Sequence, residues 1–242
     1  MEKIKIGAKA LAVLQSFGKI NPLQKITSEM LYANGEAEGQ ASGLVGVYKV
    51  PENEIVSPAF GVRSVPEFIN VTKMVKDGEM FMDGLLITVK DATKKVSYNT
   101  TPSDMIDDMP TTGQELYSAS NDVIVTFALD ESTIKDVNDT INKMSLDKLE
   151  IVVDSEGTPT LYAHSTSTND SVTFKLDGKG VEDTTLVFGS PTVLSYLLTG
   201  IYAVQVRDLG PDTGNVKAAK LVNKSLGDKE TNGELYYFYV LE

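Results

Sequence analysis

Side chains that could carry catalytic chemistry are few in this sequence. The 242 residues include one histidine, His164, and no cysteine, so a histidine-based triad would have a single possible base and no thiol nucleophile. Gly178-Lys179 lacks the upstream glycine spacing of a phosphate-binding loop, and no histidine or cysteine cluster suggests zinc. The three aspartates of residues 104–108 have no fixed ligand spacing, which favours a solvated linker over a metal site. The residue types therefore predict a protein that is not an enzyme and needs no cofactor or metal.

The lysines are distributed unevenly along the chain. The formal net charge is −12, but residues 1–26 hold five lysines and one glutamate, a net of +4, which leaves −16 for the remainder. This stretch predicts a strand at Glu2–Ile6 and an amphipathic helix at about Gly7–Gly18. The apolar stripe of that helix is formed by Ala10, Leu14 and Phe17, and the opposite face by Lys9, Ala12, Ser16 and Lys19. A basic helix face on an acidic chain favours contact with phosphates; the alternative is that the acidity only keeps the protein soluble.

The apolar residues do not form a membrane or export signal. No apolar run approaches the roughly 20 residues that span a bilayer. Near the N-terminus, Lys9 and Gln15 interrupt the apolar residues, unlike the continuous core of a signal peptide. Eight methionines without a cysteine fit a reducing compartment. We therefore expect a soluble, cytoplasmic protein, located in the host cell cytoplasm if the protein is viral.

One order of elements occurs twice along the chain: strand, helix, three strands, helix, then further strands. Residues 127 positions after the apolar stripe of the first helix are again apolar, which predicts a helix at Ser132–Ser145. A second helix, introduced by a proline, is expected after Pro66 and again at Pro191–Thr199. Between the two copies lies a proline- and hydroxyl-rich segment of little periodicity. The sequence therefore predicts a first domain at 1–102, a connector at 103–121 and a second domain at 122–242.

The repeat also predicts an architecture. Each domain would combine an antiparallel sheet with two helices that cover one sheet face, which makes the chain α+β. The outer faces of the helices would then carry the lysines as a common surface. Exposed strand edges at both ends of such a repeat favour head-to-tail association, which closes into a ring if the rotation permits.

Three stretches of the sequence resemble a known family. Residues 10–21, ALAVLQSFGKIN, are similar to the first helix of the DNA sliding clamp of T-even-like bacteriophages, and Phe60–Val89 resembles the strand, helix and strand that follow. The C-terminal Tyr236–Leu241 fits the end pattern of clamps more widely. By element order the resemblance covers nearly the whole chain.

The resemblance implies a DNA polymerase processivity factor with two similar DNA-clamp domains per chain. Sheets would lie outside and helices inside a homotrimeric, six-domain ring around duplex DNA. Its partners would be other copies of the chain, duplex DNA bound without sequence specificity, the C-terminal peptide of a DNA polymerase and an ATP-dependent clamp loader. Late-transcription factors are a further partner in that family.

The resemblance and the helix pattern together assign candidate residues to three surfaces. The DNA-facing positions of the pore would be Lys3, Lys5, Lys9, Lys19, Lys73, Lys76, Lys135, Lys143 and Lys148. The subunit interface would pair Lys95, Val96 and Tyr98 with Val172, Phe174 and Leu176 of the next protomer. The partner-peptide pocket would be bordered by Met105, Ile106, Met109, Tyr237, Tyr239 and Leu241.

Each of these assignments has a plainer alternative. Tyr98 could pack only against its own sheet edge, and the apolar residues of the connector could simply attach it to the domains. The second-domain helix carries Asp136 and Asp139 beside its lysines, so pore charge would come mostly from the first domain. A phage capsid or tail protein could also be acidic, β-rich, duplicated and free of cysteine, but it would not need lysines gathered on helix faces.

Overall fold

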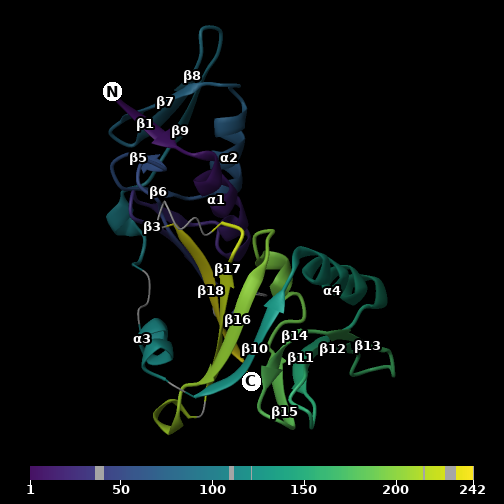
Figure 1. Ribbon diagram of the computed structural model, residues 1–242. Coiled ribbons are helices and arrows are strands. Elements are labelled where there is room, and N and C mark those ends of the chain that lie inside the picture. The colour runs from purple at the N-terminus through teal and green to yellow at the C-terminus, as the bar shows by residue number, and fades with distance from the viewer. Residues whose placement is uncertain (36–40, 109–111, 121, 215, 227–232, 242) are drawn as a thin grey trace. The chain divides into compact units, whose positions relative to one another are not determined.

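The chain folds into two units. The computed structural model describes residues 1–35, 41–108, 112–120, 122–214, 216–226 and 233–241 (Figure 1). Unit 1 comprises Met1–Asn34, Gly46–Met109 and Gly227–Leu235; unit 2 comprises Gly35–Val45, Pro110–Leu226 and Tyr236–Glu242.

Unit 1 contains a five-stranded antiparallel sheet in the order β5-β1-β7-β8-β9. Its strands are β1 (Glu2–Ile6), β5 (Ile55–Val56), β7 (Glu79–Asp83), β8 (Leu86–Lys90) and β9 (Lys95–Asn99). In β1 the buried Ile4 and Ile6 alternate with exposed lysines, so one face of the strand lies on the core and the other faces solvent. A second group pairs in the order β6-β2-β3-β4, with β2 (Gln24–Ile26), β3 (Met30–Asn34), β4 (Leu44–Lys49) and β6 (Phe60–Val62).

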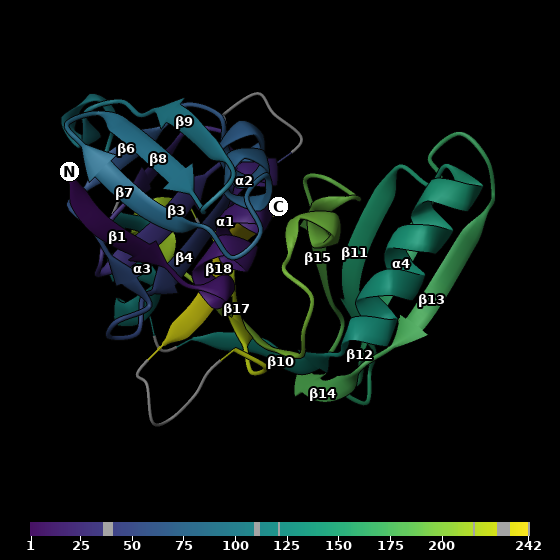
Figure 2. The same cartoon turned by 90° about the horizontal axis from the view of Figure 1, so that it is seen from above.

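Two helices pack side by side in unit 1, α1 (Ala8–Ile20) and α2 (Val65–Lys73) (Figure 2). The side chain of Ser64 accepts a hydrogen bond from the backbone N–H of Glu67 and so caps α2. Gly18 allows the close approach of the helices, because a Cβ there would lie 2.7 Å from Cγ1 of Val65. The apolar stripe predicted for α1 is confirmed, but Ser16, expected on the polar face, is buried.

Phe17 anchors α1 in the core of unit 1. Its side chain is 0% exposed, and β4 approaches it at Gly46, where a Cβ would lie 2.5 Å from Cε1 of the ring. We expect Phe17→Ala to lower the free energy of unfolding by about 3–5 kcal/mol, because it removes the ring and leaves a cavity. Urea unfolding followed by circular dichroism measures the loss, with the exposed Ala12→Ser as the control on the same helix. A loss below about 1 kcal/mol would contradict this packing.

Unit 2 is built from antiparallel strands in the order β13-β12-β11-β15-β18-β17-β16-β10-β14. Their bounds are β10 (Val123–Leu129), β11 (Lys148–Val153), β12 (Pro159–His164), β13 (Ser171–Lys175), β14 (Asp177–Gly180), β15 (Thr184–Phe188), β16 (Tyr202–Asp208), β17 (Lys217–Asn223) and β18 (Glu234–Leu241). The helix α4 (Glu131–Met144) lies against β11, β12 and β13 in Figure 2 and buries Val137 and Ile141. A short 3₁₀ turn, η3 (Pro211–Thr213), precedes β17.

The predicted helix at Pro191–Thr199 is wrong. Only a 3₁₀ turn, η2 (Val193–Tyr196), forms there, and the chain is extended at Leu197. The reason is tertiary: the backbone N–H of Leu198 donates to the hydroxyl of Tyr237 at 3.1 Å, and its carbonyl accepts from the hydroxyl of Tyr202. These two hydroxyls satisfy backbone groups that a longer helix would otherwise pair.

The duplication predicted from the sequence is confirmed by strand pairing. The order β5-β1-β7-β8-β9 in unit 1 is repeated as β14-β10-β16-β17-β18 in unit 2. Likewise β6-β2-β3-β4 is repeated as β15-β11-β12-β13. The helix α1 follows β1 as α4 follows β10, and η2 stands where α2 stands in unit 1.

The predicted connector carries more structure than expected. A 3₁₀ turn, η1 (Ser103–Met105), and a helix, α3 (Thr112–Ala119), form within it. The guanidinium of Arg207 donates to the backbone carbonyls of Tyr117 and Ser120 at 3.0 and 2.7 Å, so it caps the end of α3. The helix therefore depends on a cation that lies far away in the sequence.

Asp130 caps α4 and gives its stability a pH dependence. The backbone N–H of Thr133 donates to its carboxylate at 2.6 Å, and this bond lowers the pKa of Asp130. A lowered folded-state pKa contributes stability that is present above the unfolded value and is lost as the pH falls through the folded value. We expect Asp130→Asn to lower the melting temperature at pH 7 and to match wild type once the pH falls well below about 4. Differential scanning calorimetry with Asp136→Asn as control checks this, and a pH-independent difference would contradict it.

Candidate nucleic-acid interface

A shallow groove of about 260 Å³ runs between α1 and α2 in unit 1, and two of the predicted DNA-facing lysines line it. Lys19 comes from the last turn of α1 and Lys73 from the last turn of α2. The Nζ of Lys73 donates to Oε1 of Gln15 at 3.3 Å, which holds its ammonium group over the groove. Both lysines lie at helix C-termini, where the helix dipole favours positive charge.

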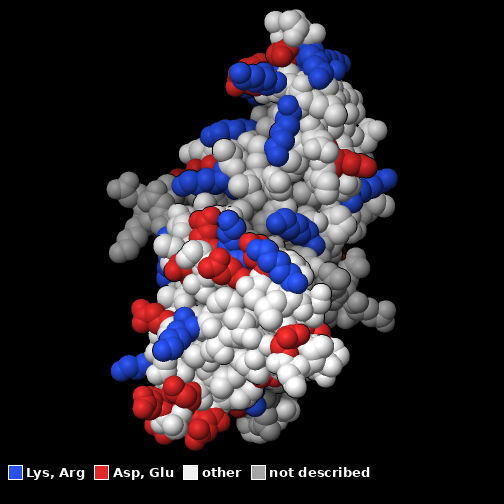
Figure 3. Space-filling view, turned by 90° about the vertical axis from the view of Figure 1, so that its right-hand side faces the viewer, with Lys and Arg blue, Asp and Glu red and all other residues white. Residues whose placement is uncertain are grey.

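Lys9 and Lys76 extend this surface. Lys9 is exposed on α1 and Lys76 is exposed just after α2. The acidic residues of α2 and of the turn after it are Glu67 and Asp77, and α1 has none. Figure 3 shows basic side chains gathered over the part of unit 1 that carries α1 and α2, with few acidic ones between them. We call Lys9, Lys19, Lys73 and Lys76 the helix lysines.

Lys3 and Lys5 do not join the helix lysines. Both project from the face of β1 opposite the buried Ile4 and Ile6, so they leave the side of the sheet that faces the core. Lys3 forms an ion pair with Glu79 at 2.6 Å, and the Nζ of Lys5 donates to a backbone carbonyl at 2.8 Å. Within unit 1, Lys3 and Lys5 therefore lie on a different surface from the helix lysines.

The lysines of unit 2 have a different electrostatic setting. Lys135 and Lys143 are exposed on α4, together with Asp136 and Asp139, and Lys143 lies 3.8 Å from Asp139. Acidic and basic side chains accordingly alternate over α4 in Figure 3. Lys148 lies in β11 on the face opposite the buried Leu149, Ile151 and Val153. The concentration of positive charge expected for the first domain thus appears on α1 and α2 and not on α4.

The predicted subunit-interface residues lie on or beside two terminal strands of the described sheets. In unit 1, β9 is the last strand of its sheet, and Val96 and Tyr98 are half-buried along it. Tyr98 also packs internally, with its ring centroid 5.5 Å from that of Phe68 and its hydroxyl near the backbone of Ser64. Lys95 is exposed at the start of the strand.

In unit 2 the corresponding element is β13, which ends its sheet with half-buried Val172 and Phe174. Leu176 follows this strand and is buried, with its backbone N–H bonded to the carbonyl of Pro159 at 3.1 Å. Each terminal strand therefore offers backbone hydrogen-bonding groups and incompletely covered apolar side chains to a further strand.

The predicted partner-peptide pocket is only partly available. Tyr237, Tyr239 and Leu241 are buried in unit 2, and the hydroxyl of Tyr239 accepts from the backbone N–H of Ser190. Among the connector residues, Ile106 is buried and Met105 is 72% exposed. Met109 lies outside the described residues.

A larger groove was not foreseen from the sequence. It measures about 800 Å³ and lies on β10, β16 and β17 of unit 2, beside Tyr117 of α3. Nothing local marks these strand positions, since small and polar residues that alternate along a strand are typical of any solvated sheet face.

The described residues contain neither a group of three or more His, Asp or Glu side chains placed to hold a metal ion nor a helix long and apolar enough to cross a membrane. The helix lysines can instead form hydrated, sequence-independent contacts with phosphates.

Comparisons with known proteins identify the fold. No protein-family model matches the chain. No curated protein is similar to it in sequence at a significant level. Among solved structures, the chain is similar to A. fulgidus PCNA bound to the C-terminal region of FEN-1, with a TM-score of 0.67, 14% identity and coverage of 99% of this chain and 97% of that one.

Two further structures agree. A PCNA2-PCNA3 complex from Sulfolobus tokodaii matches with a TM-score of 0.66, 12% identity and coverage of 100% and 99% of the two chains. The H. pylori beta clamp, in complex with 5-chloroisatin, matches with a TM-score of 0.58 and 12% identity over 99% of this chain and 63% of that one. The α+β chain with two similar domains of antiparallel strands and few helices therefore has the sliding-clamp fold.

Proposed function

We propose that this protein is a DNA sliding clamp: a non-enzymatic ring that encircles duplex DNA and tethers a DNA polymerase. The observation that carries the proposal is the exposure of the helix lysines on α1 and α2 of a clamp fold, in a chain whose net charge is −12. Segregated positive charge on an acidic protein supports a surface that meets a polyanion.

The chemistry of the surface suits sliding. A clamp must hold DNA without gripping one position, so its phosphate contacts should be numerous, weak and exchangeable. Hydrated lysines meet this need better than arginines, which bind phosphates through two parallel hydrogen bonds. The chain has two arginines, and Arg207 is engaged within unit 2 by α3 and Gln205.

We propose a homotrimer as the assembled state. A ring of six clamp domains needs three chains, because each chain has two such domains. In this ring β9 of one protomer would pair with β13 of the next as antiparallel strands. The half-buried side chains of Val96, Val172 and Phe174 would be covered by this pairing. The rival function, a structural protein of a phage capsid or tail, gains no support from the clamp fold.

The partners follow from the same proposal. They are the C-terminal peptide of a replicative DNA polymerase and an ATP-dependent clamp loader, with late-transcription factors as further partners. A. fulgidus PCNA was solved with the C-terminal region of FEN-1, which supports peptide tethering as a clamp property. A T-even-like phage source and the host cytoplasm as location rest on the sequence resemblance of residues 10–21 and 60–89.

Topological retention on DNA tests the proposal. The purified protein at high concentration is mixed with nicked circular DNA or with the same DNA linearised, and the complexes are separated by gel filtration at moderate salt. A ring should stay on the circle and slide off the linear molecule. Equal retention on both forms would indicate ordinary surface binding, and no retention on either would remove the support for encirclement.

A further inference from the structure

The groove between α1 and α2 presents two neutral amides beside its two lysines. Gln15 lies one turn before Lys19 on α1, and Asn70 lies one turn before Lys73 on α2, so each pair shares a helix face. All four side chains are exposed and line the groove, together with Gly18, which allows the helices to approach. None of the described residues that line the groove is acidic.

The hydrogen bond between Lys73 and Gln15 fixes the orientation of one amide. An ammonium group can only donate, so the atom that meets Nζ of Lys73 at 3.3 Å must be Oε1 of Gln15. The NH₂ group of Gln15, with its two donors, is then directed to the other side. Lys73 keeps two further N–H groups, because an ammonium has three. The groove therefore offers both charged and neutral donors, which suits a ligand made of acceptors.

A phosphate group fits this set of donors in charge and in size. Its oxygens only accept hydrogen bonds when it is ionised, and its negative charge favours the two ammonium groups. The groove measures about 260 Å³, which is below the size of typical small-molecule pockets, about 300–1,000 Å³. This size favours a single phosphate group over a whole nucleotide.

Unit 2 does not repeat this set of side chains. An offset of 127 residues relates buried positions of α1 to those of α4. The same offset places Asn142 at the position of Gln15, but the buried Leu146 at the position of Lys19. In place of α2, unit 2 has the short turn η2, which contains no lysine. Within the described part of the chain, each protomer therefore has one groove with two lysines and two amides.

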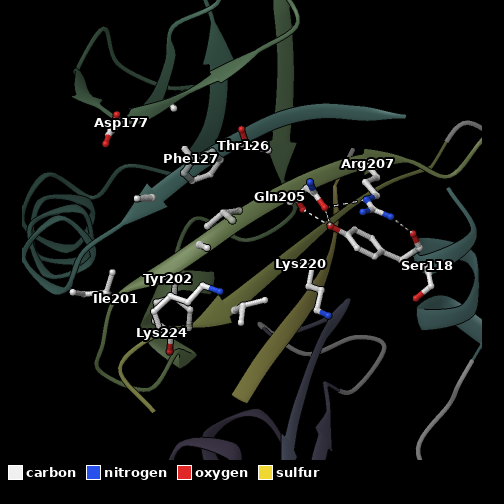
Figure 4. A pocket seen from close by; sticks show the side chains of 16 residues that line it. Ser118, Thr126, Phe127, Asp177, Ile201, Tyr202, Gln205, Arg207, Lys220 and Lys224 are labelled. Carbon is white, nitrogen blue, oxygen red and sulfur yellow. Dashed lines mark hydrogen bonds between the residues drawn. The ribbon is translucent and has the colours of Figure 1, made fainter. Parts of the chain in front are cut away.

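The larger groove on unit 2 also differs, because the chain itself engages two of its three cations. Figure 4 shows Arg207 hydrogen-bonded to Gln205, and its guanidinium also donates to the carbonyls of Tyr117 and Ser120. The ammonium of Lys220 lies 4.5 Å from the ring centroid of Tyr236. The groove between α1 and α2 thus offers the better-placed donors for an anion, although it is smaller.

We propose that this groove seats one phosphate group of the DNA backbone, and that Gln15 and Asn70 bind it through neutral hydrogen bonds. Lys19 and Lys73 would supply the charge beside them. The inference rests on the proposed clamp function and adds to it a defined contact, one phosphate for each chain. The contact is independent of sequence, since phosphate groups carry no sequence information. Neutral donors exchange their partners with water at little net cost, so such contacts are compatible with sliding.

Fluorescence anisotropy of the full chain with a short labelled DNA duplex, over a series of salt concentrations, tests the seat. The double variant Gln15→Leu, Asn70→Leu keeps the charge of the protein, so we expect its affinity to fall about tenfold and its salt dependence to stay as in wild type. In Lys19→Gln, Lys73→Gln, both the affinity and the slope of log affinity against log salt should fall. This difference in slope separates a neutral contact from a charged one.

Asn142→Leu is the matched control. It removes an exposed amide of α4 at the position equivalent to Gln15, where unit 2 has no second helix and no neighbouring lysine of α2. We expect it to bind DNA as wild type does. Thermal melting followed by circular dichroism verifies that each variant is folded.

Three results would overturn the proposal: unchanged affinity of the amide variant, an equal loss in Asn142→Leu, or the same fall in slope for the amide and lysine variants. Titration calorimetry with inorganic phosphate distinguishes the source of the ligand, since micromolar binding would assign the groove to free phosphate instead of DNA. The assay with a short duplex does not require encirclement, so it can be interpreted even if retention on circular DNA fails. Conversely, loss of the amide contact alone would leave the lysine contacts of the clamp proposal standing.

Discussion

Reversing Lys9, Lys19 and Lys73 to glutamate is expected to abolish retention on circular DNA while the assembled mass stays unchanged. All three lysines are surface residues of α1 and α2, so the core that holds the fold is untouched. Each reversal replaces an attraction to phosphate with a repulsion, and a homotrimer would repeat the change in every protomer. We expect a loss of roughly a hundredfold or more in retained complexes, and a shallower dependence of residual binding on salt.

The control for this experiment carries the same change of charge elsewhere. Lys49, Lys179 and Lys224 are exposed outside α1 and α2, and their triple reversal should retain DNA far better than the helix variant does. Light scattering on both variants verifies the assembled mass. If the two triple variants lose retention equally, overall charge and not the helix surface is responsible, and the assignment of the helix lysines is wrong.

The second large effect is expected at β13, where Phe174→Asp should convert the assembly into monomers. Phe174 is half-buried on a terminal strand, so the substitution should leave unit 2 folded. A new strand paired there would have to bury the carboxylate without a partner, which costs several kcal/mol per interface. Light scattering over a dilution series should give about three times 26.2 kDa for wild type and 26.2 kDa for the variant.

Val181→Asp provides the comparison for this prediction. Val181 is 55% exposed and lies after β14, outside both proposed pairing strands, so its variant should assemble as wild type does. A Phe174→Asp protein that keeps the trimer mass would place the interface elsewhere. A wild-type protein that is monomeric at every concentration would contradict the homotrimer and leave the two-unit fold intact.

Much of the fold follows from short-range pattern. The stripe of Ala10, Leu14 and Phe17 predicts α1, and the same spacing 127 residues later predicts α4, because a helix with one buried face needs apolar residues at this period. Alternating residues predict strands such as β1 and β11 for the same reason. The duplication can be inferred from these patterns alone, since the helices and strands of both copies have similar lengths and bury apolar residues at the same spacing.

Features that escape prediction from the sequence depend on partners far along the chain. The apolar run after Pro191 is typical of a helix, yet hydroxyls of Tyr202 and Tyr237 take the backbone groups of Leu198 and only a 3₁₀ turn forms. The helix α3 lies in a segment with little periodicity and is capped by Arg207. No local window of the sequence contains these interactions.

The candidate site likewise has features that the sequence predicts and features that only the tertiary structure shows. The order of residues is enough to show that lysines collect near the N-terminus and on predicted helices, and that the chain duplicates one α+β unit. The folded chain is needed to show that Lys3 and Lys5 lie on the face of the sheet opposite the buried isoleucines, while Lys19 and Lys73 line one groove. The physical reason is that periodicity fixes which residues of an element share a face, whereas the packing of elements against one another fixes which faces come together.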